Sequence, residues 1–417
     1  MDKARLEYVV GALRALAIKT VSDCTFNKMT SYFGIDAERA VLLPSGDEKY
    51  RSFWVRDAAM MAESGLIDNC KLKEYVEIIA AHGQNGADER RLENGLTVPP
   101  YAVADHINYD GSPVFFPGTY SSGNDQGRGS FGYFPPFCDN YYFIIMVEAY
   151  LRQSLDTDIL DKEYASMPLI CRLEKAFSGY NLDEQGLLCE SDGDKYTVDW
   201  GFVDTVKKSG RLLMASLLRY NAALAMARIF GSRMNNERCE YYTDIAQNIK
   251  NVIIDTFYDG ETGWLYSASG IGRQHDVWAT AYAVFLGITS DAKTLSALAN
   301  AYKDGTAAID GYVRHILTNE DFSSTSAWES SIAAYNTYQN GAYWATPTGW
   351  YSYALYKYNG EIDMLEDFLR HTELNKDHGT PFEWMNADKD KVSGLNYGTS
   401  GVLPYIGAKR IFDELQN

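Results

Sequence analysis

The sequence predicts an all-α fold, an (α/α)6 toroid in which roughly a dozen helices form a closed double ring of six hairpins. Apolar residues recur at helical spacing along most of the 417-residue chain, whereas alternating strand patterns are few. Loops rich in Gly, Asp, Asn and Pro separate these stretches. No Ser/Gly-rich linker or change in composition divides the chain. We therefore expect a single domain, 1–417, with long loops over one end of the ring forming a cleft.

The predicted helices follow from the apolar spacing in each stretch. In the first, Leu6, Val9, Val10 and Leu13 fall on one helix face. The same pattern predicts helices at 57–66, 72–83, 138–153, 158–178, 207–230, 236–256, 276–288, 291–303, 325–338, 348–359, 361–371 and 398–414. The stretch 86–136 lacks it and is rich in Gly, Pro, Tyr and Phe, which predicts a long functional loop. An open solenoid of helical repeats would show self-similarity at a period of ~34 to 47 residues, and the sequence shows none.

Tryptophans lie beside acidic residues at four distant points of the chain. The pairs are Trp54 with Asp57, Trp200 with Asp199, Trp328 with Glu329, and Trp384 with Glu383. An aromatic ring packs on the apolar C–H face of a pyranose, while a carboxylate binds its hydroxyls or serves as acid or base. The pattern is typical of a carbohydrate-active enzyme, although chance placement explains any single pair more simply.

Composition excludes several other classes. Lys+Arg 38 against Asp+Glu 56 gives a net charge of -18, which argues against nucleic acid or an anionic membrane and is compatible with a small, neutral carbohydrate. The cysteines have no metal-ligand spacing, and no GxSxG, P-loop, HExxH or dinucleotide fingerprint occurs, so we expect reduced thiols, no metal and no cofactor. The first residues lack a signal-peptide segment and no run approaches the ~20 apolar residues of a membrane span, which favours a cytoplasmic protein. A secreted protein whose signal has been removed would look the same.

The first motif spans 53–59, just ahead of an apolar helix. Arg56 as donor and Asp57 as acceptor match two vicinal hydroxyls, with Trp54 as an aromatic wall. Helix capping is the alternative interpretation. Asp139, ahead of another apolar helix, and His275 are further candidate substrate contacts. Capping or a buried polar role is their alternative.

The second and third motifs combine polar turns with aromatic residues. Asp199 lies beside Trp200 in a Gly-flanked loop, where a raised pKa would suit a general acid; a turn or cap role is equally compatible. In the third motif, Asn340 and Gly341 mark a tight turn from which Tyr343 and Trp344 would project toward substrate. The candidate substrate contacts of these two motifs are Trp200, Asn340, Tyr343 and Trp344. Core packing of those rings is the alternative.

The fourth motif surrounds Glu383, which lies between Phe382 and Trp384 behind a proline and outside any apolar helical stripe. A carboxylate in that setting is a candidate catalytic base rather than a solvated surface charge. Trp384 is a candidate substrate contact beside it.

In this order the motifs resemble those of the six-hairpin glycosidases, over about residues 50–410. The segments that carry the resemblance are Trp54-Val55-Arg56-Asp57, Val198-Asp199-Trp200, Asn340-Gly341-Ala342-Tyr343-Trp344, Phe382-Glu383-Trp384 and Tyr397-Gly398-Thr399-Ser400-Gly401. In motif order the chain is most similar to the amylo-α-1,6-glucosidase domain of glycogen debranching enzymes and to glucoamylases, processing α-glucosidases and α-L-rhamnosidases. The resemblance implies an (α/α)6 barrel, inversion at the anomeric carbon, hydroxyl binding by Arg56 and Asp57, Asp199 as acid and Glu383 as base. Inversion implies carboxyl groups ~6.5–9.5 Å apart.

The sequence departs from that pattern at two positions. Val198 stands where debranching enzymes usually carry an aromatic residue before the aspartate, and Ala345 replaces a common proline. Reserve acids are therefore Glu329, Glu190 and Asp204. We expect an exo-acting hydrolase of an α-linked gluco-type oligosaccharide or small glycoside. The alternatives are an α-L-rhamnosidase-like hydrolase of another sugar and a catalytically silent carbohydrate-binding toroid.

Overall fold

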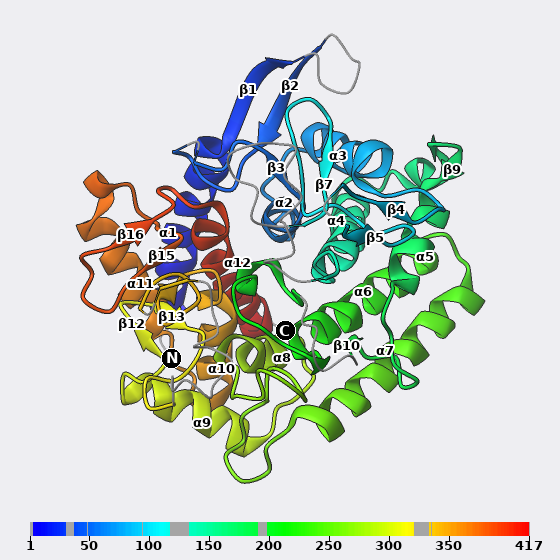
Figure 1. The fold of residues 1–417 in the computed structure, drawn as a ribbon. Coiled ribbons are helices and arrows are strands. Elements are labelled where there is room, and N and C mark those ends of the chain that lie inside the picture. Colours follow the sequence, from blue (N-terminus) through cyan, green and yellow to red (C-terminus); the bar gives the residue numbers. More distant parts are fainter. Residues whose placement is uncertain are drawn as a thin grey trace.

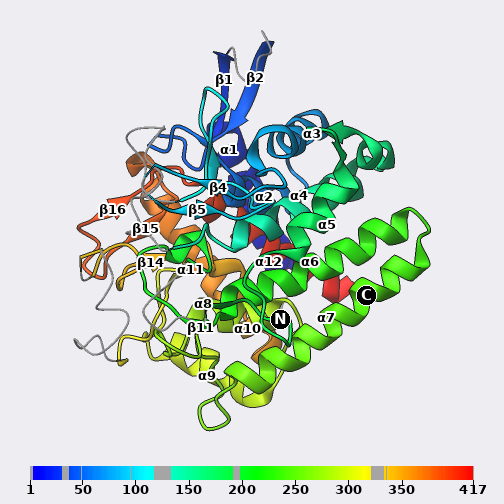
Figure 2. The ribbon, with the colours of Figure 1, turned by 45° about the vertical axis from the view of Figure 1, so that its right-hand side comes forward.

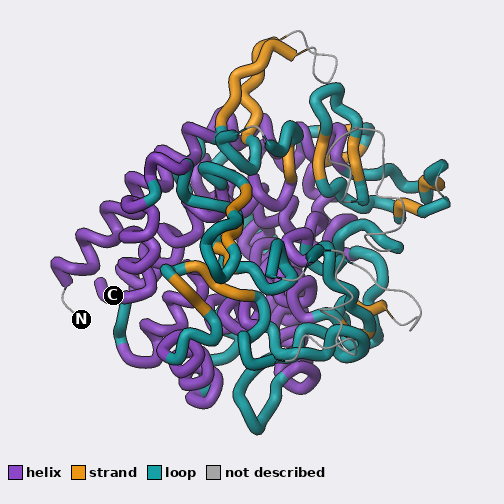
Figure 3. Tube along the Cα trace, turned by 60° about the vertical axis from the view of Figure 1, so that its left-hand side comes forward, coloured by secondary structure: helices purple, strands orange, loops and turns teal. Residues whose placement is uncertain are grey.

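A computed structural model describes residues 3–30, 37–47, 49–93, 95–116, 133–190, 198–320, 333–334 and 336–416, without the side chains of 27–40. Helices form the body of the molecule, and short strands lie among the loops (Figures 1 and 3). None of the helices in these ranges is long and apolar enough to cross a bilayer.

Six helices form an inner ring in which each helix contacts the next, and the last contacts the first. α2 and α8 are buried along their whole length because almost every residue in them is apolar or small. Along the chain the inner helices are α2 (Val55–Ala62), α4 (Cys138–Ser154), α6 (Leu213–Ser232), α8 (Val277–Phe285), α10 (Thr348–Asn359) and α12 (Gly398–Gln416).

The alternate helices form an outer layer, and each packs on the inner ring through a single buried stripe. In α1 this stripe is the predicted one and contains Leu6, Val9 and Leu13. The outer helices are α1 (Lys3–Asp23), α3 (Asn69–Ile78), α5 (Leu169–Ser178), α7 (Asn236–Phe257), α9 (Ala292–Lys303) and α11 (Asp363–Leu374). Because α1 packs on α12, the first and last helices close the double ring (Figure 1). The predicted toroid is confirmed.

Most predicted helices agree with the structure to within a few residues, and α10 has the predicted bounds. The prediction of one helix over 158–178 is wrong. A 3-10 turn at Thr157–Asp161 and a β-hairpin precede α5, because Ala165 and Ser166 adopt positive φ angles of 46° and 62° and form a tight reversal. The predicted helix 325–338 lies mostly outside the described residues; 333–334 and 336–338 form bends, turns and a bridge.

The strands pair into small antiparallel sheets. The largest contains five strands in chain order: β12 (Ala308–Ile309), β13 (Tyr312–Arg314), β14 (Tyr343–Trp344), β15 (Trp384–Met385) and β16 (Val392–Ser393). A three-stranded sheet joins β3 (Phe53–Trp54), β6 (His106–Ile107) and β7 (Pro113–Val114). The remaining pairs are β1 (Thr25–Thr30) with β2 (Ala37–Leu42), β4 (Arg90–Arg91) with β5 (Thr97–Val98), β8 (Glu163–Tyr164) with β9 (Met167–Pro168), and β10 (Cys189–Glu190) with β11 (Gly210–Arg211). The hairpin of β1 and β2 projects from the helical body (Figures 1 and 2).

Candidate active site

A narrow pocket lies at the N-terminal ends of α2 and α12. It is lined by Tyr50, Trp54, Arg56, Asp57, Phe202, Glu383 and Tyr397. These residues come from the start of α2, the segment before α6, the loop before β15, and the residue before α12. The structure therefore brings together the first and fourth sequence motifs, which are more than 300 residues apart.

Glu383 has the environment of a buried, hydrogen-bonded carboxylate. Only 1% of it is exposed, and the Tyr50 hydroxyl lies 2.8 and 2.7 Å from its two oxygens. Its backbone N–H donates to the carbonyls of Ser393 and Gly394, which fixes the backbone at Glu383. Burial raises the pKa of Glu383 to about 7, although the ammonium of Lys49, 3.6 Å from Oε2, and the Tyr50 hydroxyl oppose the rise.

Arg56 lies in the first turn of α2 and is held between rings and carboxylates. Its guanidinium is 5.4 Å from the ring centres of both Trp54 and Phe202, and its Nη1 donates to Asp105 at 2.6 Å and to Asp139 at 3.5 Å. A cation between two rings and several buried carboxylates is strongly fixed. Asp139 therefore lies behind Arg56, as support for it, and outside the pocket lining.

The backbone must pass very close to Arg56. A Cβ atom at Gly201 would lie 2.0 Å from the Arg56 Cζ, so only glycine fits there. This contact fixes the segment that carries Phe202 against the Arg56 side chain.

The carboxylates around Arg56 differ in pKa. Burial acts to raise the pKa of Asp105, but Arg56 and the imidazole of His106 outweigh it and the pKa is lowered. Burial raises the pKa of Asp139 well above its usual range and that of Asp57 to about 6. Asp57 accepts a hydrogen bond of 3.0 Å from the Tyr397 hydroxyl. A donor and an acceptor thus reach the pocket side by side, as hydroxyl recognition requires.

Asp199, the predicted acid, is in a buried ionic network outside the pocket lining. It is fully buried, accepts the Trp200 backbone N–H at 2.8 Å, and has the Lys208 Nζ 3.3 Å from Oδ1. Lys208 also lies 3.9 Å from Asp276, which accepts from the start of α8 and pairs with His315 at 3.2 Å. Burial raises the pKa of Asp199, offset in part by Lys208. These contacts are those of a residue that fixes its loop.

The reserve acids take different positions. Asp204 follows the Gly201–Val203 turn, is buried, and accepts a hydrogen bond of 2.9 Å from the Gln339 side chain. Its negative charge acts on Glu383 and raises the pKa of that residue. Glu190 is buried in β10, and Glu329 lies outside the described residues.

Four of the predicted substrate contacts lie outside the pocket lining, and two of them, Trp200 and Trp344, pack in the aromatic core. Trp200 and Trp344 are fully buried, and both pack on Phe202, with ring centres 5.0 and 5.9 Å away. They support the ring that borders the pocket. Tyr343 and Trp384 pair with neighbouring strands in the five-stranded sheet.

Two further predicted contacts also lie outside the pocket lining. Asn340 donates to the Ala333 carbonyl within its turn. His275 lies between Asp259 at 3.1 Å and Glu320 at 2.9 Å.

Sequence reasoning assigned no role to Tyr50, Asp105 or Phe202. Tyr50 lies four residues before Trp54, but its hydrogen-bond partner Glu383 is 333 residues away in the sequence. Asp105 precedes His106 in the loop that was expected to be functional. The composition of the loop could have drawn attention to Asp105. Nothing in the local sequence marks Tyr50, whose role depends on the fold.

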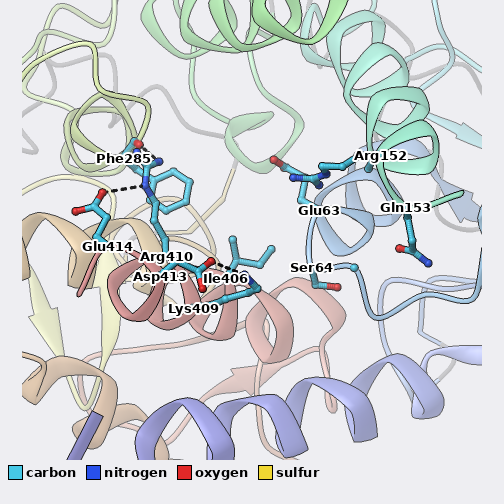
Figure 4. A pocket seen from close by; sticks show the side chains of 12 residues that line it. Glu63, Ser64, Arg152, Gln153, Phe285, Ile406, Lys409, Arg410, Asp413 and Glu414 are labelled. Atoms are coloured by element: carbon cyan, nitrogen blue, oxygen red, sulfur yellow. Dashed lines mark hydrogen bonds and ion pairs between the residues drawn. The ribbon is translucent and has the colours of Figure 1, made fainter. Parts of the chain in front are cut away.

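A larger cavity of about 580 Å³ lies at the opposite ends of the same inner helices (Figure 4). Glu63 and Arg152 come from the C-terminal ends of α2 and α4, and Arg410 and Glu414 from that of α12. α2, α4 and α12 therefore point their N-terminal ends toward the pocket that contains Glu383. Burial raises the pKa of Glu63 to about 7 as well.

No protein-family model and no curated protein matches the sequence. Solved structures are similar in fold. A rhamnosidase from Klebsiella oxytoca with rhamnose bound has a TM-score of 0.58 at 13% identity, covering 96% of this chain and 64% of that chain. The GH78 family rhamnosidase of Bacillus sp. GL1 has a TM-score of 0.59 at 11% identity, and the match covers 96% of this chain and 34% of that chain. A glucoamylase from Saccharomycopsis fibuligera has a TM-score of 0.60 at 13% identity, and the match covers 100% of this chain and 97% of that chain. The chain spans less than two thirds of either rhamnosidase. The likeness confirms the predicted six-hairpin architecture.

Proposed function

We propose that the chain is an inverting glycoside hydrolase with Glu383 as general base and Asp204 as general acid. The pocket carries the proposal: a buried carboxylate held by the Tyr50 hydroxyl faces an Arg–Asp pair inside a wall of aromatic rings. Fold likeness to glycosidases supports the same class of chemistry.

The pocket encloses only about 10 Å³ in this conformation, so it must open to take a sugar, and we propose that it takes one terminal sugar and not the middle of a long chain. Tyr50, Trp54 and Tyr397 offer rings to the C–H faces of a pyranose, while Asp57 accepts from its hydroxyls and Arg56 donates. A narrow pocket, in place of an open groove, supports exo action.

Hydrolysis needs one proton donated and one removed. Glu383 takes a proton from a water molecule as the water oxygen attacks the anomeric carbon. The glycosidic C–O bond breaks on the opposite face, and Asp204 gives its proton to the leaving oxygen. A base with a pKa near 7 is well matched to this work at neutral pH.

Asp204 is preferred to Asp199 because of their contacts. Asp204 follows the pocket residue Phe202 by two positions and accepts a hydrogen bond from the uncharged Gln339 amide, which is compatible with a protonated carboxyl group. Asp199 would have to leave the Lys208 ammonium, which is fully buried with it. Of Asp199 and Asp276, Lys208 would then keep only the more distant Asp276, at 3.9 Å, which is unfavourable for a buried ammonium.

The substrate that we propose is an α-linked gluco-type oligosaccharide or small glycoside. An α-L-rhamnoside is the second candidate, since a similar structure is a rhamnosidase with rhamnose bound. A panel of α- and β-linked aryl glucosides and rhamnosides, followed by NMR, separates them by the sugar that is released. Inversion predicts that an α-glucoside first yields β-glucose.

Three variants test the assignment: Glu383→Gln, Asp204→Asn and Asp199→Asn. On the cleaved glycoside we expect the first two to lower kcat by about 10²–10⁴-fold with the fold intact by circular dichroism. Glu63→Gln is the matched control, because Glu63 has a similarly raised pKa at the far end of the ring, and it should keep full activity.

Two results would change the proposal. Activity retained in Asp204→Asn but lost in a folded Asp199→Asn would make Asp199 the acid. Sugar binding without cleavage of any glycoside would make the protein a silent carbohydrate-binding toroid.

A further inference from the structure

A cavity of about 440 Å³ lies behind the strand that follows Glu383. It is bounded by α11, whose His371 and Leu374 line it, and by the β15–β16 hairpin, which contributes Met385 and Val392. Its size falls within the range of about 300–1,000 Å³ that is typical of small-molecule sites.

The floor of the cavity, formed by Phe382, is adjacent in sequence to the candidate base Glu383. Phe382 lines this cavity, while the next residue, Glu383, lines the sugar pocket. The Phe382 backbone N–H donates to the Tyr312 hydroxyl at 3.0 Å. The His371 ring lies edge-on to Tyr312 and Phe382, at 5.2 and 6.0 Å between ring centres. A ligand on this floor would contact the backbone segment that positions the base.

His371 lines the cavity with its ring. It is 8% exposed, and its Nδ1 is buried without a hydrogen-bond partner in the part of the chain that the structure describes. Burial lowers the pKa of His371, with Asp310 opposing and Lys389 reinforcing the change, so the imidazole is neutral at pH 7. Because Nδ1 has almost no accessible surface, a ligand in the cavity contacts the ring of His371 and not this nitrogen.

The rim combines cations with exposed apolar side chains. The Arg370 side chain is 66% exposed and bonds Asp367 through one nitrogen, which leaves most of its five N–H donors for other partners. Lys389 is 50% exposed and pairs with Asp310, a carboxylate that also lines the cavity. Leu374 and Val392 are exposed to 76% and 41%. Apolar groups gathered around a cavity rich in donors indicate a ligand that is both apolar and rich in acceptors.

We propose that this cavity binds a small amphipathic anion, an apolar ring or branched chain with one carboxylate. The apolar body packs on Phe382 and Met385, and the carboxylate accepts from Arg370 and Lys389 at the rim with His371 beneath. Binding of such an anion does not depend on the proposed hydrolase activity; only an effect of the ligand on turnover rests on it.

Phenylacetate is a suitable probe, with phenylacetamide as its uncharged equivalent and acetate as the anion without a ring. We expect titration calorimetry to show millimolar binding of phenylacetate, and at least tenfold weaker binding of both analogues. The imidazole proton signal of His371, assigned by its loss in His371→Phe, should move as phenylacetate binds.

Variants locate the site. Arg370→Gln combined with Lys389→Gln changes only exposed rim residues and should weaken phenylacetate binding at least tenfold. Arg152→Gln, in the cavity at the far end of the ring, is the matched control and should not change it. Glu383→Gln should also keep binding, because the anion lies outside the sugar pocket. The proposal is overturned if phenylacetate does not bind, if phenylacetamide binds equally well, or if the rim variant binds like the wild type.

Discussion

At the residue scale, Glu383 shows opposing influences on one carboxyl group. Burial favours the protonated form, whereas Lys49 and Tyr50 favour the carboxylate, and the resulting pKa is about 7. A protonated Glu383 cannot accept a proton from water. We therefore expect kcat/KM to fall as the pH decreases through about 7.

Lys49 is the residue through which this pH dependence can be changed. Lys49→Met removes a cation 3.6 Å from Oε2 and should raise the pKa of Glu383. Because the Lys49 side chain is 43% exposed, solvent screens the effect, and we expect the acidic limb to move to higher pH by about half a unit to one unit. The measurement is kcat/KM between pH 5 and 9. Lys376→Met is the control, because Lys376 is exposed and pairs with Glu373 three residues before it. This change should leave the acidic limb of the pH profile in place.

The candidate site was predictable from the sequence where one segment carries both the aromatic and the charged residue. Arg56, Asp57 and Glu383 do reach one pocket, and their motifs are local. The ionic partner of Asp199 could not be predicted, because Lys208 is nine residues away in an irregular segment whose path only the fold determines. Trp200 illustrates the same limit, because the sequence around it does not distinguish a tryptophan of the core from one that packs on a substrate.

At the element scale, the crossing of α10 and α12 depends on two glycines. A Cβ at Gly407 would lie 2.3 Å from the Gly349 carbonyl oxygen, and one at Gly349 would lie 2.1 Å from the Leu403 carbonyl oxygen. The helices therefore approach until their backbones touch. α12 positions Tyr397 at its start, so the crossing also fixes one wall of the pocket.

Opposite results are expected for glycine-to-alanine changes in two helices. Gly407→Ala should destabilise the protein by about 1–3 kcal/mol or more, because α10 and α12 must separate. Gly11→Ala, in the exposed face of α1 with no atom within 4 Å, should stabilise it by about 0.5–1 kcal/mol through helix propensity. Urea unfolding measures both. Equal effects of the two changes would contradict the close crossing.

The elements themselves were predictable to unequal degrees. Outer helices such as α1 and α7 have one apolar stripe, which periodicity detects. The strands of the five-stranded sheet are two or three residues long, too short for any alternation to appear. They form because the loops at the ends of distant helices meet, which is a tertiary effect.

At the scale of the whole molecule, the ring is closed where α1 meets α11 and α12. Arg5 donates to both carboxylate oxygens of Glu366, from Nε at 2.6 Å and Nη2 at 2.5 Å, and also reaches Asp363. This bidentate pair joins the first helix to the eleventh across 361 positions of sequence.

A double-mutant cycle measures that closure. For Arg5→Ala with Glu366→Ala we expect a coupling free energy of about 0.5–1 kcal/mol in urea unfolding, since the geometry is bidentate although the groups are partly exposed. The pair Lys409 and Asp413, within α12 alone, serves as control and should give no more than about 0.5 kcal/mol. A coupling for Arg5 below that of the control would show that apolar packing alone closes the ring.

The distance in sequence between the two halves of the pocket determines when the pocket can form during synthesis on the ribosome. Asp57 is made early and Glu383 late, on the order of half a minute later at ~10 residues per second. Until the last helix emerges, α2 has neither the neighbour that completes the inner ring nor the carboxylate that it faces. A nascent chain, or a fragment cut before Glu383, carries Arg56 and Asp57 without the carboxylate of Glu383, so the complete pocket can exist only in a molecule whose synthesis has passed through α12.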